Sequence, residues 1–220
     1  MSHEVKKIKA AKAALAYVVD ADIVGIGTGS TVDLFIAELA NSCHNISAVV
    51  ASSERSKELL IAASFKVIDA SCADNIDVYI DGADEIAANH CCIKGGGGAL
   101  TGEKIIAAIA DKFICIVDDT KVVTSLGGNF PLAIEVLPAA RSHVGRQCVI
   151  LGGSPVYREG FITDNGNIIL DVYGLDFTNM NDIAMRINNI VGVVCHGLFI
   201  EQSPDIIIVG TDNGTRVLVR

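Results

Sequence analysis

The sequence has no tryptophan, no long run of basic residues, and no apolar run of the ~18 residues that a membrane span requires. Its longest apolar candidate, residues 105–117, is interrupted by Asp111 and Lys112. The 220 residues carry a formal net charge of −9, which argues against a nucleic-acid-binding protein because such proteins carry basic patches. We therefore expect neither a membrane nor a nucleic-acid partner, and an anionic ligand must be bound by local lysines and backbone N–H groups.

Sequence patterns typical of metal-binding sites are also missing. The cysteines form no C-x-x-C pair, and they lie at positions 43, 72, 91, 92, 115, 148 and 195. None of the histidines lies four residues from another. We predict no metal and no organic cofactor. The odd number of cysteines favours reduced thiols that serve as small apolar residues, as in a reducing compartment.

The N-terminal residues 1–17 form a charged amphipathic segment with Val5, Ile8 and Leu15 along one side. This segment lacks the apolar core and the small-residue cleavage site of a secretory signal peptide. We therefore expect a cytoplasmic protein.

Helices and short apolar strands alternate from the N-terminus to about residue 128. Strands are expected at residues 23–26, 46–50, 66–68, 77–80 and 113–117, and helices at 31–40, 54–63 and 98–110. Strands that are almost continuously apolar, with helices between them, predict a parallel sheet covered on both faces. The fold class is therefore α/β, with a Rossmann-like sheet flanked by helices.

Residues 130–200 follow a different order, β-α-β-β-α-β. The elements are expected at residues 132–136, 139–150, near 161–163, 168–172, 181–190 and 193–200. This order is typical of a smaller ferredoxin-like α+β domain. The Asn165-Gly166 pair between the two middle strands predicts a hairpin turn. Residues 127–129 and 203–204 are the natural boundaries.

The densest group of polar residues follows the strand at 77–80. It contains two aspartates, a lysine, four glycines and a glutamate: Asp81, Asp84, Lys94, Gly95 to Gly98 and Glu103. Carboxylates beside a lysine and a bare backbone loop suit a site that binds a polar anion and moves a proton on it. An ordinary Asp-Gly turn and a flexible glycine linker are the alternatives. The lysine before the glycines and the helix after them favour the site.

A second polar loop joins the strand at 23–26 to the helix at 31–40. Its residues are Gly27, Thr28, Gly29, Ser30 and Thr31. Glycines let the backbone approach a ligand, and a helix N-terminus offers N–H groups, so this loop predicts a phosphate site. Val32 replaces the third glycine of the dinucleotide fingerprint, and no G-K-[ST] is present. A single phosphate therefore fits better than a nucleotide, and a simple helix cap stays the alternative.

These motifs, in this order, resemble the type A ribose-5-phosphate isomerase family over nearly the whole chain. The matching segments are GTGST (27–31), SSE (52–54), DGADE (81–85), IKGGGGALTGEKI (93–105), FICIVDDTK (113–121), FPLAIEVLP (130–138), TDNGNIILDV (163–172), GLF (197–199) and IIIVGTDNG (206–214). One departure is Gly98, where the family often has alanine.

The resemblance implies an aldose-ketose isomerase that interconverts D-ribose 5-phosphate and D-ribulose 5-phosphate through an enediolate. It places this reaction in the non-oxidative branch of the pentose phosphate pathway and points to a homodimer, with a dimer of dimers as the alternative. It also implies that the C-terminal hairpin rejoins the first sheet. We therefore expect a catalytic domain of residues 1–128 and 205–220, and a smaller domain of residues 129–204.

The resemblance also assigns roles. It places the general base at Glu103; a first-turn glutamate favoured by the helix dipole is the alternative. Lys94 and the glycine N–H groups after it would stabilise the enediolate oxygens. Asp81 and Asp84 would bind sugar hydroxyls and assist ring opening, and Lys7 is a further candidate cation. The implied substrate-binding residues are Thr28, Gly29, Ser30, Thr31, Asp81, Gly82, Ala83, Asp84, Lys94, Gly95, Gly96, Gly97 and Lys121.

Three other functions stay open. A nucleotide-dependent oxidoreductase is disfavoured by the incomplete dinucleotide fingerprint. A non-enzymatic sugar-phosphate sensor domain would share the loop at 27–31, but such proteins carry a DNA-binding helix-turn-helix, for which there is no room before Ile23. A CoA-transferase-like enzyme would use a glutamate as a covalent nucleophile on a similar sheet.

Overall fold

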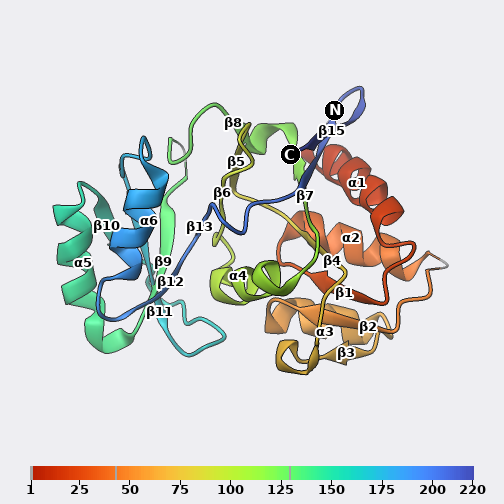
Figure 1. Cartoon of the computed structure of the whole chain (residues 1–220), viewed down its shortest axis with the longest axis horizontal. Coiled ribbons are helices and arrows are strands. Elements are labelled where there is room, and N and C mark those ends of the chain that lie inside the picture. The colour runs from red at the N-terminus through yellow and green to blue at the C-terminus, as the bar shows by residue number, and fades with distance from the viewer. Residues whose placement is uncertain (1, 43, 129) are drawn as a thin grey trace. The chain divides into compact units, whose positions relative to one another are not determined.

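The computed structural model describes residues 2–42, 44–128 and 130–220, and the chain forms two compact units (Figure 1). Unit 1 comprises the chain up to Ala83, Gly102–Val122 and Gln202–Arg220; unit 2 comprises Asp84–Thr101 and Val123–Glu201. Residues 84–101, which we expected in the first domain, thus belong to unit 2, because Ala87, Cys91 and Ile93 pack into its core. Cys43 and Asn129, the expected start of the second domain, lie outside the described residues.

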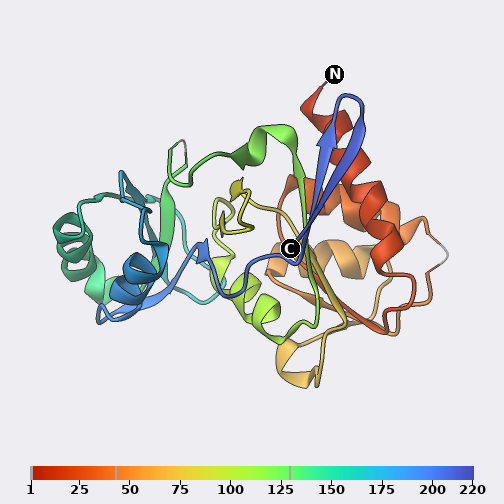
Figure 2. The ribbon, with the colours of Figure 1, turned by 45° about the horizontal axis from the view of Figure 1, so that its top comes forward.

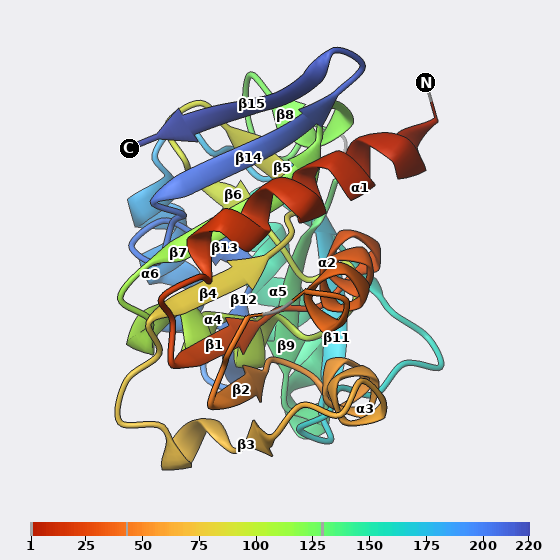
Figure 3. The same cartoon turned by 90° about the vertical axis from the view of Figure 1, so that its right-hand side faces the viewer.

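Unit 1 contains a seven-stranded sheet in the order β3-β2-β1-β4-β7-β14-β15, whose strands follow one another from bottom to top in Figure 3. Its strands are β1 (Ile23–Ile26), β2 (Ala48–Ala51), β3 (Val67–Ile68), β4 (Val78–Asp81), β7 (Phe113–Asp118), β14 (Ile206–Thr211) and β15 (Gly214–Val219). All neighbours are parallel except β14 and β15. The six parallel strands follow the doubly wound order 3-2-1-4-5-6, in which ligands bind where the order reverses. Here that point lies between β1 and β4.

Helices cover both faces of this sheet (Figures 1 and 3). The helical elements are α1 (His3–Ala14), η1 (Leu15–Tyr17), α2 (Ser30–Ala40), α3 (Glu54–Ala62), η2 (Ala70–Cys72), α4 (Leu100–Ile109) and η3 (Asp119–Lys121). Alternate strand residues such as Val24, Ile26 and Ile80 pack against α1, α2 and α3. The residues between them face α4, whose Ile106 lies against Gly25. The predicted α/β fold class is confirmed.

The C-terminal hairpin completes unit 1, as the resemblance implied, since β14 pairs in parallel with β7. Figure 2 shows this hairpin beside α1. Lys9 Nζ donates hydrogen bonds to the carbonyl oxygens of Thr211 (3.1 Å) and Asp212 (2.8 Å). A Cβ on Gly210 would lie 1.9 Å from the Lys6 carbonyl oxygen, so glycine is required where α1 crosses β14.

Unit 2 has the expected β-α-β-β-α-β order. Its elements are β9 (Leu132–Val136), η4 (Pro138–Ala140), α5 (Arg141–Ile150), β10 (Ser154–Tyr157), β11 (Ile168–Tyr173), α6 (Met180–Asn188) and β12 (Val193–His196). The strands form an antiparallel sheet in the order β10-β11-β9-β12, the ferredoxin-like arrangement.

One strand prediction in unit 2 is wrong. The strand expected near residues 161–163 lies at Ser154–Tyr157, where Tyr157 pairs with Leu170. The turn at Asn165-Gly166 does form, because the Gly166 N–H donates to the Thr163 carbonyl oxygen (2.8 Å). The side chains of this turn, however, bond to the buried carboxylate of Glu135, which accepts from Thr163 Oγ1 at 2.7 Å. A buried carboxylate needs such donors, and this need draws residues 163–167 out of the strand ladder.

A third, small sheet has the order β13-β6-β5-β8. Its strands are β5 (Glu85–Ala87), β6 (Cys92–Ile93), β8 (Val122–Val123) and β13 (Leu198–Phe199). The single strand expected at 193–200 is thus divided into β12 and β13. In the described parts of the chain, the structure has no helix that is both long enough and apolar enough to cross a membrane.

Candidate functional site

The loop at residues 27–31 lies at the carboxyl end of β1 and opens α2. Gly29 is the N-cap of α2 with a φ of +129°, and a Cβ there would meet open space. Positive φ favours glycine, and the first N–H groups of the helix have no partner within it. Lys7 from α1 donates from Nζ to Ser30 Oγ (2.9 Å), which places a positive charge beside the loop. This arrangement suits an anion such as phosphate.

The polar groups of Thr28 bond to residues inside unit 1 and do not face the proposed anion site. Its N–H donates to Asp81 Oδ1 (3.0 Å), and its hydroxyl donates to Ser53 Oγ (2.7 Å). The same hydroxyl lies 2.8 Å from Ser52 Oγ. Thr28, Gly29 and Thr31 are partly exposed, and Ser30 is exposed. Because the N–H and hydroxyl of Thr28 already bond within unit 1, Gly29, Ser30 and Thr31 are better placed to contact a ligand.

Asp81 ends β4, beside β1 and at the point where the strand order reverses. Its carboxylate is fully buried, and Oδ1 accepts hydrogen bonds from the N–H groups of Thr28 (3.0 Å) and Gly82 (2.7 Å). Oδ2 accepts a hydrogen bond from the Tyr79 hydroxyl. A Cβ on Gly27 would lie 1.9 Å from Asp81 Cγ, so only glycine fits beside this carboxylate.

Glu103 lies in the first turn of α4 and is 4% exposed. Burial raises the pKa of Tyr79 well above its usual value of 10.0, and the negative charges of Asp81 and Glu103 raise it further. Both carboxylates therefore lie within electrostatic reach of one phenol. The start of α4 is pressed against the end of β2, since a Cβ on Gly102 would lie 2.2 Å from the Ser52 carbonyl oxygen. This close approach fixes the position of Glu103.

Asp84 and the glycine loop lie in unit 2. Asp84 Oδ2 accepts a hydrogen bond from the Gly96 N–H (2.8 Å) and so orients the loop. Arg158, paired with Asp171, donates to the carbonyl oxygens of Gly95 (3.1 Å) and Gly96 (3.2 Å). The loop is therefore held from both its N–H and its carbonyl side, which argues against a flexible linker.

Two of the glycines have conformations that other residues avoid. Gly95 has a φ of +111° and Gly98 a φ of +79°. A Cβ on Gly98 would lie 2.2 Å from Phe161 Cζ, so an alanine at this position would require the phenyl ring to move. Glycine is thus needed at these two positions for the backbone conformation of the loop.

Lys94 directly precedes this loop and is 2% exposed. Its backbone N–H donates to the Gly197 carbonyl oxygen (2.8 Å), which anchors it beside β13. Its ammonium nitrogen lies 5.7 Å from the centre of the Phe199 ring, within the range of a cation–π interaction. A buried lysine is unusual, and its charge must be compensated.

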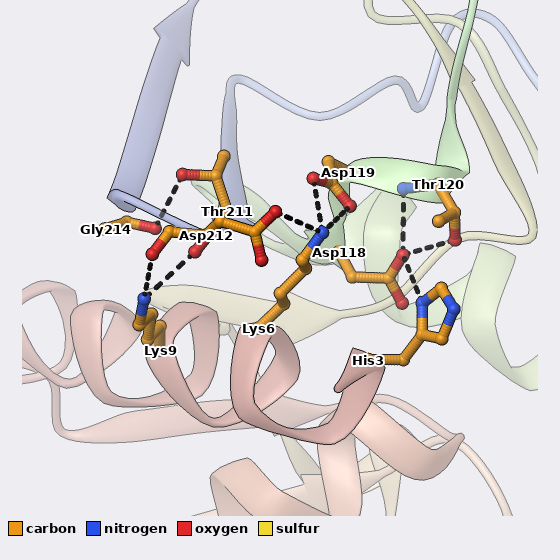
Figure 4. Close-up of polar contacts among 9 residues, drawn as sticks. All are labelled: His3, Lys6, Lys9, Asp118, Asp119, Thr120, Thr211, Asp212 and Gly214. Carbon is orange, nitrogen blue, oxygen red and sulfur yellow. Dashed lines mark hydrogen bonds and ion pairs between the residues drawn. The ribbon is translucent and has the colours of Figure 1, made fainter. Parts of the chain in front are cut away.

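Lys121 ends η3, which follows the carboxyl end of β7. Asp81 lies at the carboxyl end of the neighbouring parallel strand β4. Figure 4 shows how this turn is held, with Lys6 of α1 between Asp119 and Asp212. Lys6 Nζ lies 2.8 Å from Asp119 Oδ2 and 3.3 Å from Asp212 Oδ2. The hydrogen bond to Asp119 raises the pKa of Lys6 above its usual 10.5, against the opposing effect of burial. The protonated ammonium therefore anchors the turn that carries Lys121.

Among the described residues, no group of three or more His, Cys, Asp or Glu side chains could hold a metal ion. Burial raises the pKa of the Cys148 thiol to about 11, so this cysteine stays protonated and packs as an apolar residue.

The structure groups the predicted site residues into two sets. Unit 1 holds the loop at 27–31, Asp81 to Ala83, Glu103 and Lys121; unit 2 holds Asp84 and Lys94 to Gly97. Sequence reasoning missed Tyr79 and Arg158. The alternation along β4 contains a signal for Tyr79, since residues 79 and 81 share a strand face. No sequence signal links Arg158 to the glycine loop.

The chain is similar to known proteins over most of its length. The family model for ribose 5-phosphate isomerase A (phosphoriboisomerase A) matches residues 48–214. The ribose-5-phosphate isomerase A of Haemophilus influenzae is 51% identical over 215 residues, which cover 98% of both chains.

Two solved structures are similar over nearly their full length. That of ribose 5-phosphate isomerase A from Neisseria gonorrhoeae is 40% identical with a TM-score of 0.96, covering 99% of this chain and 97% of that one. A D-ribose-5-phosphate isomerase in complex with phospho-erythronic acid is 38% identical with a TM-score of 0.94, covering 100% of both chains. This chain belongs to the ribose 5-phosphate isomerase A family.

Proposed function

We propose that this protein catalyses the reversible isomerisation of D-ribose 5-phosphate to D-ribulose 5-phosphate through an enediolate. Family membership supports the reaction. The structural observation that carries it is a pair of buried carboxylates in unit 1, Asp81 at the end of β4 and Glu103 in the first turn of α4. The reaction moves one proton between adjacent carbons, which a positioned carboxylate can do without a cofactor.

Glu103 is the proposed base. It takes the proton from C2 of the open-chain aldose, the electron pair of that C–H bond forms the C1–C2 double bond, and O1 takes up the negative charge. A proton moves from O2 to O1, and Glu103 returns its proton to C1 as C2 becomes the carbonyl carbon. Asp81 is less suited to this step because its oxygens already accept hydrogen bonds from Tyr79, Thr28 and Gly82. It is better placed to orient a hydroxyl and assist ring opening.

The developing charge on O1 and O2 needs donors. We assign this role to Lys94 and to the N–H groups of Gly95 and Gly97, with Asp84 holding Gly96 in place. Residues 94–97 lead directly into α4, so chain connectivity ties these donors to the helix that carries Glu103.

The phosphate group is assigned to Gly29, Ser30 and Thr31, with Lys7 adding charge and Lys121 supplying a further cation. One solved relative is in complex with phospho-erythronic acid, a phosphorylated sugar acid. We expect this protein to bind the same compound in competition with its substrate.

A direct assay tests the proposal. Purified protein should convert ribose 5-phosphate to ribulose 5-phosphate at an unchanged rate after exhaustive treatment with EDTA, because no step requires a metal. Product formation can be followed by NMR. Absence of conversion would contradict the proposed reaction, and a loss of rate restored by a divalent cation would contradict the proposed mechanism.

We also propose that the protein is a cytoplasmic homodimer in the non-oxidative branch of the pentose phosphate pathway. Closed two-fold dimers are the commonest assembly of soluble enzymes. Light scattering at micromolar concentration should give twice the 23.1 kDa mass of one chain. A mass of one chain across a tenfold dilution series would contradict the dimer.

A further inference from the structure

Beyond the residues assigned above, we infer that Tyr79 is a positioning residue: its hydroxyl holds one oxygen of Asp81 in place, while the other oxygen of Asp81 binds the phosphate-binding loop. This inference rests on the proposed function of the same site. It concerns a side chain that takes no part in the proton transfer itself.

The hydroxyl of Tyr79 has a defined partner in a fully buried setting. Tyr79 and Asp81 are both 0% exposed, and the phenol donates to Asp81 Oδ2. Oδ1 accepts from two backbone N–H groups, and the Tyr79 hydroxyl adds a side-chain donor on Oδ2. Because burial and the neighbouring carboxylates raise the pKa of Tyr79 well above 10.0, the phenol keeps its proton and acts only as a donor to Asp81.

The surrounding packing leaves the phenol little freedom to move. Its ring lies 4.8 Å from the Phe113 ring, centre to centre. A Cβ on Gly25, the neighbour of Tyr79 across the sheet, would lie 3.0 Å from Tyr79 Cδ2 and 2.7 Å from Ile106 Cγ2. Because Gly25 has no side chain, the Tyr79 ring and Ile106 of α4 can both pack against this position. Ile106 lies three residues after Glu103, on the same face of the helix. Tyr79 thus supports Asp81 and packs beneath the helix that carries Glu103.

A chain of hydrogen bonds extends from Tyr79 to the phosphate loop. The Tyr79 hydroxyl donates to Asp81 Oδ2, and Asp81 Oδ1 accepts a hydrogen bond from the Thr28 N–H (3.0 Å). Ser52 Oγ lies 2.8 Å from the Thr28 hydroxyl. The four residues Tyr79, Asp81, Thr28 and Ser52 therefore form a hydrogen-bonded chain. It joins the end of the site that we assign to phosphate to the carboxylate that we assign to the sugar hydroxyls.

Kinetics on Tyr79→Phe, Asp81→Asn and the double variant test this inference. Tyr79→Phe keeps the ring and removes one hydrogen bond to a charged group, so kcat/KM should fall about tenfold. In the Asp81→Asn background the same change should alter kcat/KM less than about threefold, because residues that act through one another are not additive. Tyr17→Phe, the same chemical change in η1 of unit 1, should leave the kinetics unchanged.

Other results would overturn the inference. A kcat/KM for Tyr79→Phe within about twofold of wild type would show that the phenol only fills the core. An equal loss in both backgrounds would show that it does not act through Asp81. Ser52→Ala, which changes the far end of this hydrogen-bonded chain, provides a second test and should be non-additive with Tyr79→Phe. If the wild-type protein fails to isomerise ribose 5-phosphate at all, the proposed function fails instead, and this outcome is distinguishable in the same assay.

Discussion

Replacing Glu103 with glutamine is expected to lower kcat by roughly 10²–10⁴-fold, the usual contribution of general acid–base catalysis. Glutamine keeps the size of the side chain and can still hold a hydroxyl, but it has no basic oxygen. KM should therefore change little, which is typical of an interaction used mainly in the transition state. Steady-state kinetics on folded protein, verified by thermal unfolding, measures both constants.

Matched variants separate the base from its neighbours. Glu54→Gln makes the same change in the first turn of α3, at an exposed position, and should leave kcat near normal. Asp81→Asn and Asp84→Asn should each lower kcat less than Glu103→Gln does, since we assign them to ring opening and positioning. If the Glu103→Gln variant keeps more than about a tenth of wild-type kcat, Glu103 is not the base, and Asp81 or Asp84 becomes the leading candidate.

Removing the phosphate from the substrate is expected to have a comparably large effect. Three hydrogen bonds to a charged group contribute about 1.5–3 kcal/mol each, so ribose should have a kcat/KM lower by roughly 10³-fold or more than ribose 5-phosphate. The binding energy of the phosphate helps to position the reacting end of the sugar. The same assay with both sugars measures the ratio.

Loss of a single phosphate contact should act mainly on binding. Thr31→Ala should raise KM for ribose 5-phosphate while kcat changes less. Thr215→Ala, on the exposed side of β15, is a suitable control and should match wild type. Equal turnover of ribose and ribose 5-phosphate would show that the loop at 27–31 only caps α2.

Much of the fold follows from local patterns. The short apolar runs between helical segments predict the parallel strands, and the β-α-β-β-α-β order predicts the antiparallel sheet of unit 2. The position of β10 could not be predicted in this way. The donors at residues 163–167 are visible in the sequence, but their common partner, Glu135, lies on β9 and becomes adjacent only after the sheet has formed.

The residues of the candidate site are proposed from the sequence, but the sequence did not show how they divide between the two units. Asp81 and Asp84 read as one motif, yet they fall in different units. The reason is the packing of the chain after Ala83: Ala87 and Ile93 join the apolar core of unit 2, while Val78 and Ile80 belong to that of unit 1. This division depends on which apolar core each residue joins, and a short sequence motif does not contain that information.

Hydrogen exchange at C1 of ribulose 5-phosphate tests the central claim most directly, because it reports proton removal by the base without requiring ring opening. In D2O, wild-type protein should introduce deuterium at C1, as seen by NMR. Asp81→Asn should retain this exchange, whereas in Glu103→Gln the exchange rate should fall by roughly 10²-fold or more. Exchange by Glu103→Gln at more than about a tenth of the wild-type rate would contradict the assignment of Glu103 as the group that moves the proton.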